Sequence, residues 1–247
     1  MKSNFPRSHE RSLGYRLPSS HHLSREIIRE ILLLFFVLFL PGMLVAGEAV
    51  DIRLFDQAGF HLNYAIITIP QILLVLYIIR IQPHLWPPEF GLRLPRARDL
   101  LHAAVIVIML YVTFGVLLLA SSVLELAGFD LTPPAGGGFR LTRAAMLPLV
   151  AITSLLTGYR EELFFRAYML PRLRQAGVKF PTAVAVSTAL FAIGHLYQGV
   201  LGVVFAAMIG VVMAIAFRLR PSVHPIGLAH AAYNLLTLVF TLIADRA

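Results

Sequence analysis

The sequence predicts an all-α protein, a polytopic transmembrane helix bundle of about seven spans. Composition is the first reason: of 247 residues, 58% are hydrophobic and 14% are charged, whereas an ordinary soluble domain has about 25% charged residues. The second reason is that the apolar residues gather in runs close to the ~20 residues that a helix needs to cross a bilayer. A soluble globule of this composition would lack the polar side chains to cover its surface, so an integral membrane protein is the better interpretation.

The apolar runs lie at residues 31–47, 60–81, 100–127, 144–170, 181–198, 200–219 and 223–243. Because unpaired backbone groups are costly in lipid, each run is expected to be helical. A long polar segment precedes the first run, which favours an uncleaved signal-anchor over a cleaved signal peptide. We therefore divide the chain into a flexible cytoplasmic tail at 1–25, three membrane spans with their loops at 26–142, and a four-span core at 143–247.

The basic residues alternate along the chain as the positive-inside rule requires, if the N-terminus is cytoplasmic. The segments then placed outside hold only Arg53, Arg140, Arg143 and Arg246. The net charge of +8 is thus explained by topology rather than by nucleic acid, which we exclude as a partner. An arginine-rich, lysine-poor chain suggests a GC-rich bacterial genome, so we expect a multi-pass protein of the bacterial inner membrane. With no cysteine in the chain, neither disulfides nor thiolate chemistry is available.

The sixth run holds a stripe of small residues spaced four apart. At helical spacing these residues share one face, which is typical of a close contact between two membrane helices. We interpret this stripe as packing without chemistry. Its members are Gly202, Ala206, Gly210 and Ala214.

The fourth run carries charges, in the stretch "TGYREELFFRAYML" at 157–170. Ionisable groups inside a span cost about 2.5–3.5 kcal/mol on insertion scales, so a chain that keeps them usually uses them. Glu162 and Arg166 are four residues apart and can pair along a helix. That pairing leaves Glu161 without a local partner and makes it a candidate general base. Arg160 is expected to point elsewhere, although it could compete for Glu161.

Two later runs carry polar residues at helical spacing. In "LFAIGHLYQG", Phe191 and His195 are four apart, so the aromatic ring is expected to pack over the face that carries the imidazole. In "GLAHAAYNLL", His230 and Asn234 are four apart on one face. Either His or Asn alone would more often serve as interhelical glue, and Glu162 with Arg166 could be a structural salt bridge. Together, on three spans, these groups could supply a base, an acid–base partner and oxyanion donors for hydrolysis.

These motifs resemble those of a known family. "EELFFR" resembles the E-E-x-x-x-R motif of the CPBP intramembrane proteases, which include type II CAAX prenyl endopeptidases and bacteriocin-processing proteins. "FAIGH" is similar to the family's F-x-x-x-H motif, and "HAAYN" to its H-x-x-x-N motif. The resemblance covers roughly residues 144–243, and the three motifs occur in the family's order.

The resemblance implies a CAAX-endopeptidase-like core and a glutamic endopeptidase that needs neither metal nor cofactor. Its substrate would be a membrane-associated protein or peptide in the lipid bilayer. By this resemblance Glu161 and His195 activate the attacking water, and His230 and Asn234 stabilise the oxyanion. The supporting residues would be Glu162, Arg166 and Phe191.

Other functions stay open at this point. A zinc metalloprotease could use Glu161, His195 and His230 as ligands, although the chain has no H-E-x-x-H helix. A non-enzymatic immunity or scaffolding protein would use the same polar groups to hold helices together. A transporter could use Glu161 as a proton relay, but the sequence shows no inverted repeat. One difficulty remains for the peptidase: straight helices would place His195 nearer the outer face than Glu161.

Overall fold

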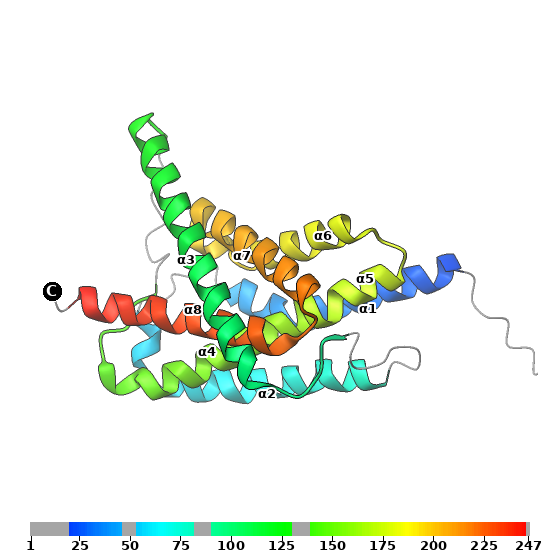
Figure 1. The fold of residues 1–247 in the computed structure, drawn as a ribbon. Helices are drawn as coiled ribbons and strands as arrows, with labels where there is room; N and C mark the ends of the chain where they lie inside the picture. Colours follow the sequence, from blue (N-terminus) through cyan, green and yellow to red (C-terminus); the bar gives the residue numbers. More distant parts are fainter. Residues whose placement is uncertain (1–19, 46–52, 82–89, 130–138, 246–247) are drawn as a thin grey trace, which may run out of the picture.

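A computed structural model of the protein describes residues 20–45, 53–81, 90–129 and 139–245, and these residues are all helical or irregular, without a strand (Figure 1). Each predicted apolar run contains a helix, so the predicted fold class is confirmed. The α-helices are α1 (Ser20–Val45), α2 (Ala58–Arg80), α3 (Ala97–Leu126), α4 (Leu147–Glu162), α5 (Leu170–Gln175), α6 (Phe180–Ile193), α7 (Gly199–Leu219) and α8 (Val223–Ala244). Short 3₁₀ segments occupy η1 (Leu54–Asp56), η3 (Ala144–Met146) and η5 (Leu196–Gln198), and the π-helix η4 (Leu163–Met169) joins α4 to α5.

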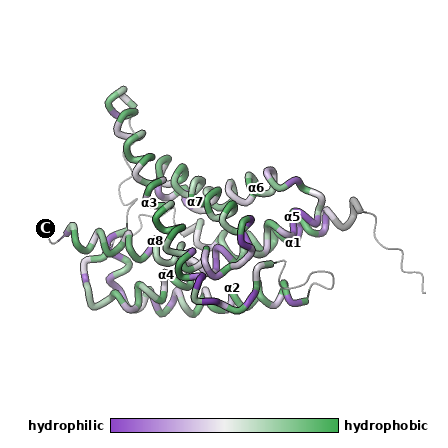
Figure 2. Tube along the Cα trace, viewed as in Figure 1, coloured by the Kyte–Doolittle hydropathy of each residue, from purple (hydrophilic) through white to green (hydrophobic). Residues whose placement is uncertain are grey.

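The outer surface of the bundle is apolar. Among the described residues, α2, α3, the η5–α7 segment and α8 are long and apolar enough to cross a membrane. Figure 2 shows these helices to be hydrophobic over most of their length. Large side chains such as Leu62, Leu119 and Val200 are more than 60% exposed, which water would disfavour and lipid tails accept. The protein is therefore an integral membrane protein.

Helices α4 and α8 pack against each other at the centre of the bundle, with α2 beside α4 and α3 beside α8. Helices α6 and α7 form a second pair, and α1 lies beside α5 (Figure 1). Helix α3 leans away from the other helices, so its C-terminal half projects from the bundle (Figure 1). The central α4–α8 pair is the frame on which the charged motif and the third motif meet.

Glycines set the closest helix contacts. A Cβ on Gly158 of α4 would lie 2.7 Å from the Gly227 carbonyl oxygen and 2.8 Å from the Ala231 nitrogen of α8. A Cβ on Gly210 of α7 would lie 3.0 Å from the side chain of Thr188 on α6. The small-residue stripe of α7 is buried along its length, as predicted; it comprises Gly202, Ala206, Gly210 and Ala214. Small residues thus let the backbones approach within the bundle.

Two predicted segments differ in the structure. Helix α1 begins at Ser20, so the end of the predicted flexible tail is helical, while residues 1–19 lie outside the described part. The fifth apolar run was expected to be one span to residue 198, but α6 ends at Ile193. At 1.5 Å per residue its 14 residues extend only about 21 Å, less than the roughly 30 Å hydrocarbon core. The chain then turns within the bundle and enters α7.

Candidate active site

The charged motif spans the junction of α4 and the π-helix. Glu162 Oε1 accepts a hydrogen bond from Arg166 Nη1 at 2.9 Å, and both side chains are completely buried. The predicted pair is therefore present. The whole of η4 is buried, and π-helical turns occur frequently at functional sites. The Arg166 guanidinium also lies 4.6 Å from the ring centroid of Phe191 and donates to the Gly210 carbonyl at 3.3 Å.

His230 of α8 joins the two carboxylates. Its Nδ1 lies 2.8 Å from Glu162 Oε1, and its Nε2 lies 3.6 Å from Glu161 Oε2. The Gly158 contact described above brings α8 this close to α4, one turn before Glu161. Glu161 Oε2 is buried, yet it has no hydrogen-bond partner within the described part of the chain. This oxygen is therefore available to a water molecule or a substrate group.

His195 lies in the turn after α6 rather than on the helix, which corrects its predicted place within a long span. Its Nδ1 lies 2.9 Å from the Phe191 carbonyl oxygen. The Phe191 ring is 4.7 Å from the His195 ring and 6.0 Å from the His230 ring, measured between centroids. The ring contact predicted from the four-residue spacing is present. Because α6 ends early, the chain turns at His195, which lies near enough to Glu161 to interact with it electrostatically.

The hydrogen bonds of the two imidazoles assign their tautomers. The partner of each Nδ1 is an accepting oxygen: the Phe191 carbonyl for His195 and, for His230, the Glu162 oxygen that also accepts from Arg166. Each Nδ1 therefore carries the hydrogen, and in a neutral ring each Nε2 keeps its lone pair. Backbone and carboxylate partners of this kind fix both the orientation and the proton position of a histidine.

Asn234 follows His230 by one turn on α8, as the spacing predicted. Its side chain is half-buried. Within the described residues its amide takes part in no hydrogen bond, so its N–H groups can donate to an incoming group. Glu162 and Arg166 are thus completely buried, whereas His195 and Asn234 are only partly buried.

Arg160 corrects one expectation from the sequence. It does not point away from Glu161: its Nη2 lies 3.2 Å from Glu161 Oε1, so Glu161 has a local partner after all. Adjacent residues on a helix point about 100° apart, but the long arginine side chain bends back to reach the carboxylate. The site also includes Tyr197, whose ring stacks on His195 with centroids 6.3 Å apart. Sequence reasoning missed Tyr197 because it lies in the short η5 segment and belongs to none of the motifs.

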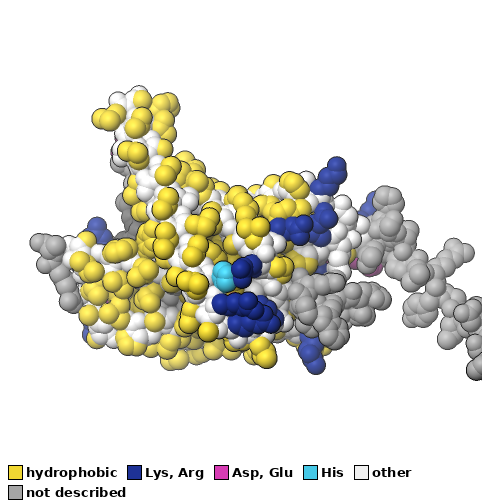
Figure 3. Space-filling view, in the orientation of Figure 1, with side chains coloured by type: hydrophobic (Ala, Val, Ile, Leu, Met, Phe, Trp, Pro, Cys, Tyr) yellow, Lys and Arg dark blue, Asp and Glu magenta, His cyan; other side chains and the backbone are white. Residues whose placement is uncertain are grey.

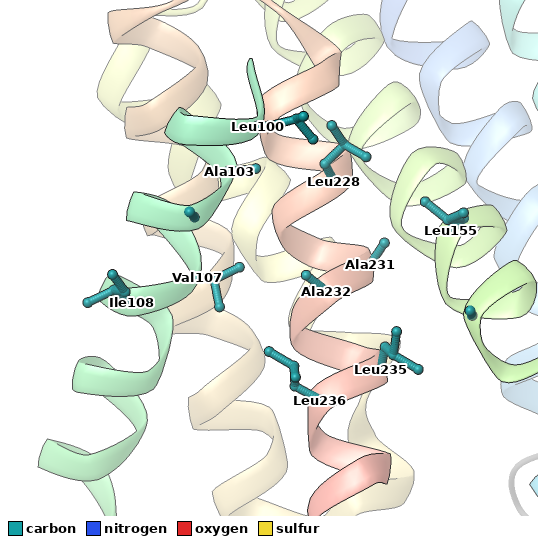
Figure 4. A pocket seen from close by; sticks show the side chains of 12 residues that line it. Leu100, Ala103, Val107, Ile108, Leu155, Leu228, Ala231, Ala232, Leu235 and Leu236 are labelled. Atoms are coloured by element: carbon teal, nitrogen blue, oxygen red, sulfur yellow. The ribbon is translucent and has the colours of Figure 1, made fainter. Parts of the chain in front are cut away.

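Two further observations bear on what the site can hold. Among the described residues, no group of three or more His, Asp and Glu side chains has the arrangement needed to hold a metal ion. An apolar cavity of about 570 Å³ lies between α3, α4 and α8 (Figure 4). Only Leu, Ala, Val and Ile line it, among them Leu155 and Ala231. Since none of the motif carboxylates or imidazoles lines it, the cavity is separate from the polar site.

Comparison with known protein families gives a match over part of the chain. Residues 143–236 match the family described as type II CAAX prenyl endopeptidase Rce1-like. This segment contains the whole charged motif and both histidine motifs, so the family resemblance read from the sequence is confirmed. No curated protein and no solved structure matches the chain.

Proposed function

We propose, from the premise that residues 143–236 carry an Rce1-like endopeptidase domain, that this membrane protein hydrolyses peptide bonds of membrane-associated proteins or peptides. The observation that carries the proposal is the position of His230, whose two ring nitrogens face Glu162 at 2.8 Å and Glu161 at 3.6 Å. A merely structural pair needs neither a second carboxylate nor an unpaired oxygen beside it. A hydrolytic site that uses a carboxylate as its base can use both, since the unpaired oxygen can hold a water molecule and take its proton.

In the proposed reaction, water lies between Glu161 Oε2 and His195 Nε2. Its oxygen attacks the carbonyl carbon of the scissile peptide bond while these groups take its proton. As the tetrahedral intermediate collapses, the C–N bond breaks and the proton passes to the leaving amine. Glu161 and His195 thus act as a base first and as an acid afterwards, which restores the site.

The oxyanion of that intermediate would be stabilised by His230 and Asn234. Asn234 donates through its amide N–H, and His230 donates from Nε2 when both of its ring nitrogens carry hydrogen. The buried Glu162–Arg166 pair supports this state, because Glu162 accepts from His230 Nδ1 and fixes the ring. The Phe191 ring fills the space between the two imidazoles.

We also infer that the end of the bundle at which α5 ends lies towards the cytoplasm and that the N-terminus is cytoplasmic. The support is the clustering of basic side chains at one end of the molecule, which Figure 3 shows against a mostly apolar surface. The α1 start, the α2 end and the α5 end lie at that same end (Figure 1), and they carry Arg29, Arg80 and Arg174. A bacterial inner membrane and a leader peptide or sorting tail as substrate fit the composition of the chain.

The test compares cells that express wild-type protein with cells that express Glu161→Gln or Glu161→Ala, by proteomics of membrane-anchored peptides. We expect cleavage products that occur with the wild type and are missing from both variants, which should still be inserted and folded. Glu125→Gln is the matched control, because Glu125 is an exposed carboxylate of α3 far from the site. Full processing by a well-expressed Glu161→Gln variant would overturn the proposal and favour a non-enzymatic membrane partner. Metal analysis of purified protein, with activity measured after chelation, tests the zinc alternative.

A further inference from the structure

Arg160 is a largely buried cation whose setting comes from outside the matched domain. Its side chain is 14% exposed. The guanidinium carbon lies 5.1 Å from the ring centroid of Phe39 in α1 and 5.6 Å from that of Tyr64 in α2. Its Nη1 donates to Gln71 Oε1 in α2 at 3.3 Å. Two aromatic rings and an amide oxygen are groups that hold a guanidinium in a fixed orientation.

The groups that hold Arg160 are themselves fixed. Gln71 Nε2 donates to the Leu38 carbonyl of α1 at 3.2 Å, which leaves its oxygen directed at Arg160. The Thr157 hydroxyl donates to the Thr153 carbonyl, so it accepts from the Tyr64 hydroxyl at 2.7 Å. The cradle of Arg160, formed by Phe39, Tyr64 and Gln71, is therefore braced by hydrogen bonds to α1 and to α4. A braced cradle limits the positions that the guanidinium can adopt.

The consequence falls on Glu161, because its two oxygens have different partners. Oε1 accepts from Arg160 Nη2 at 3.2 Å, and Oε2 faces His230 Nε2 without a hydrogen bond. A carboxylate held by one oxygen keeps the other aimed in one direction. Without Arg160 the carboxyl group could turn, or could be protonated, since burial disfavours its charged form.

From this arrangement we propose that Arg160 is a positioning residue, through which α1 and α2 hold the Glu161 carboxylate ionised and oriented towards His230. This proposal rests on the proposed function, because the orientation of Glu161 matters only if Glu161 activates water. It extends that function to residues outside 143–236, namely Phe39, Tyr64 and Gln71. The N-terminal helices would then be part of the active site rather than only a membrane anchor.

The experiment measures Glu161 directly and needs no substrate. Dicyclohexylcarbodiimide, a hydrophobic reagent, modifies protonated carboxyl groups, and mass spectrometry reports the fraction of Glu161 labelled in folded protein in micelles. We expect Arg160→Gln to raise the labelling of Glu161 near neutral pH by about tenfold, the lower end of a neighbouring cation's influence. Arg160→Lys should restore most of the wild-type behaviour, because it returns a cation. Gln71→Leu, a milder change, should raise the labelling less.

Two controls separate positioning from a general loss of structure. Arg218→Gln removes another arginine that lies over an aromatic ring, 5.3 Å from Phe180, and it should leave the labelling of Glu161 unchanged. Labelling of Glu162 should stay at the wild-type level in every variant, because Arg166 and His230 remain. Unchanged labelling of Glu161 in folded Arg160→Gln, or an equal rise in Arg218→Gln, would overturn the proposal. Since labelling needs no turnover, a failure here is distinct from a failure of the cleavage experiment.

Discussion

The matched core and the N-terminal helices contribute to the site in different ways. The core, at 143–236, supplies nearly all of its charge: Glu161, Glu162 and Arg166 lie within one helical stretch, and His230 reaches them from α8. Helices α1 and α2 supply mainly neutral groups, aromatic rings and an amide, which surround the charge and hold it. On the proposed function, the core would carry the chemistry and the N-terminal helices would hold its charged groups in place.

Helix α1 also makes polar contacts of its own with the core, one of them from the Ser24 hydroxyl to the Ala176 carbonyl at 3.2 Å. Glu30 accepts a hydrogen bond from the Tyr168 hydroxyl at 2.6 Å and forms an ion pair with Arg172. Helix α3, in contrast, approaches α8 through apolar side chains and a long hydrogen bond from Tyr111 to the Tyr233 carbonyl. Among the N-terminal helices, α1 and α2 are thus tied to the site and α3 is peripheral to it.

The variant Arg166→Met is the strongest test of the difference between the charged core and the N-terminal helices. Removing one partner of a completely buried pair leaves Glu162 with a single neighbour, and we expect a loss of about 3–5 kcal/mol of unfolding free energy. The double variant Glu162→Gln with Arg166→Met should lose less, because no unpaired charge remains. Unfolding in detergent micelles measures both.

The control for this pair is Arg140→Met. Arg140 forms an exposed ion pair with Asp245 at 3.3 Å, and such pairs contribute about 0–1 kcal/mol. Equal losses of unfolding free energy in Arg140→Met and Arg166→Met would contradict the inference that the buried Glu162–Arg166 pair matters more to stability than an exposed ion pair.

Gly158→Ala tests the frame of the core. The new methyl group would meet the Gly227 carbonyl oxygen at 2.7 Å, so α4 and α8 must move apart, at a cost of about 1–3 kcal/mol. Cleavage should fall as well, because His230 moves away from Glu161 and Glu162. Thermal unfolding and product formation in cells are the measurements.

Gly115→Ala provides the matched change in a peripheral helix. Nothing lies within 4 Å of a Cβ at Gly115 in α3, so alanine should be neutral or stabilise by up to ~1 kcal/mol through helix propensity. If Gly158→Ala were as harmless as Gly115→Ala, the close α4–α8 contact would not matter to the site.

Tyr168→Phe tests the tie between α1 and the π-helix. The variant keeps the buried ring and loses the hydrogen bond to Glu30, at an expected cost of about 1–2 kcal/mol. Tyr77→Phe, on an exposed tyrosine of α2, should change nothing. A stability unchanged by Tyr168→Phe would show that α1 is held by apolar packing alone. Thermal unfolding in micelles distinguishes the two outcomes.

The smallest expected effect concerns Asp56, at the junction that joins η1 to the start of the core. Burial acts to raise the pKa of Asp56, but hydrogen bonds from Thr142 and from the Arg143 backbone outweigh it and hold the pKa below its ordinary value. A lowered pKa in the folded state contributes stability that is complete above the ordinary pKa, near 3.9, and is lost as pH falls through the folded value.

Asp56→Asn should therefore cost about 1 kcal/mol near pH 7, where the hydrogen bonds to a charged acceptor are present. The difference in unfolding free energy between wild type and variant should stay constant from about pH 7 to pH 5 and shrink below about pH 4. Unfolding measured across this range gives the result, with Glu125→Gln as the exposed-carboxylate control. A difference that grows as the pH falls would contradict a lowered pKa of Asp56 in the folded protein.

The sequence by itself determined the helical membrane fold, the residues of the three motifs and the pairing of Glu162 with Arg166. These depend on composition and on spacing along one helix, both of which can be read directly from the sequence. Only the tertiary structure decided the rest. The π-helix, the early end of α6 and the position of His195 in the turn after it follow from how helices pack. Arg160 was misplaced because the groups that hold it come from α1 and α2. Contacts between segments distant in sequence leave no periodic pattern, so spacing alone could not reveal them.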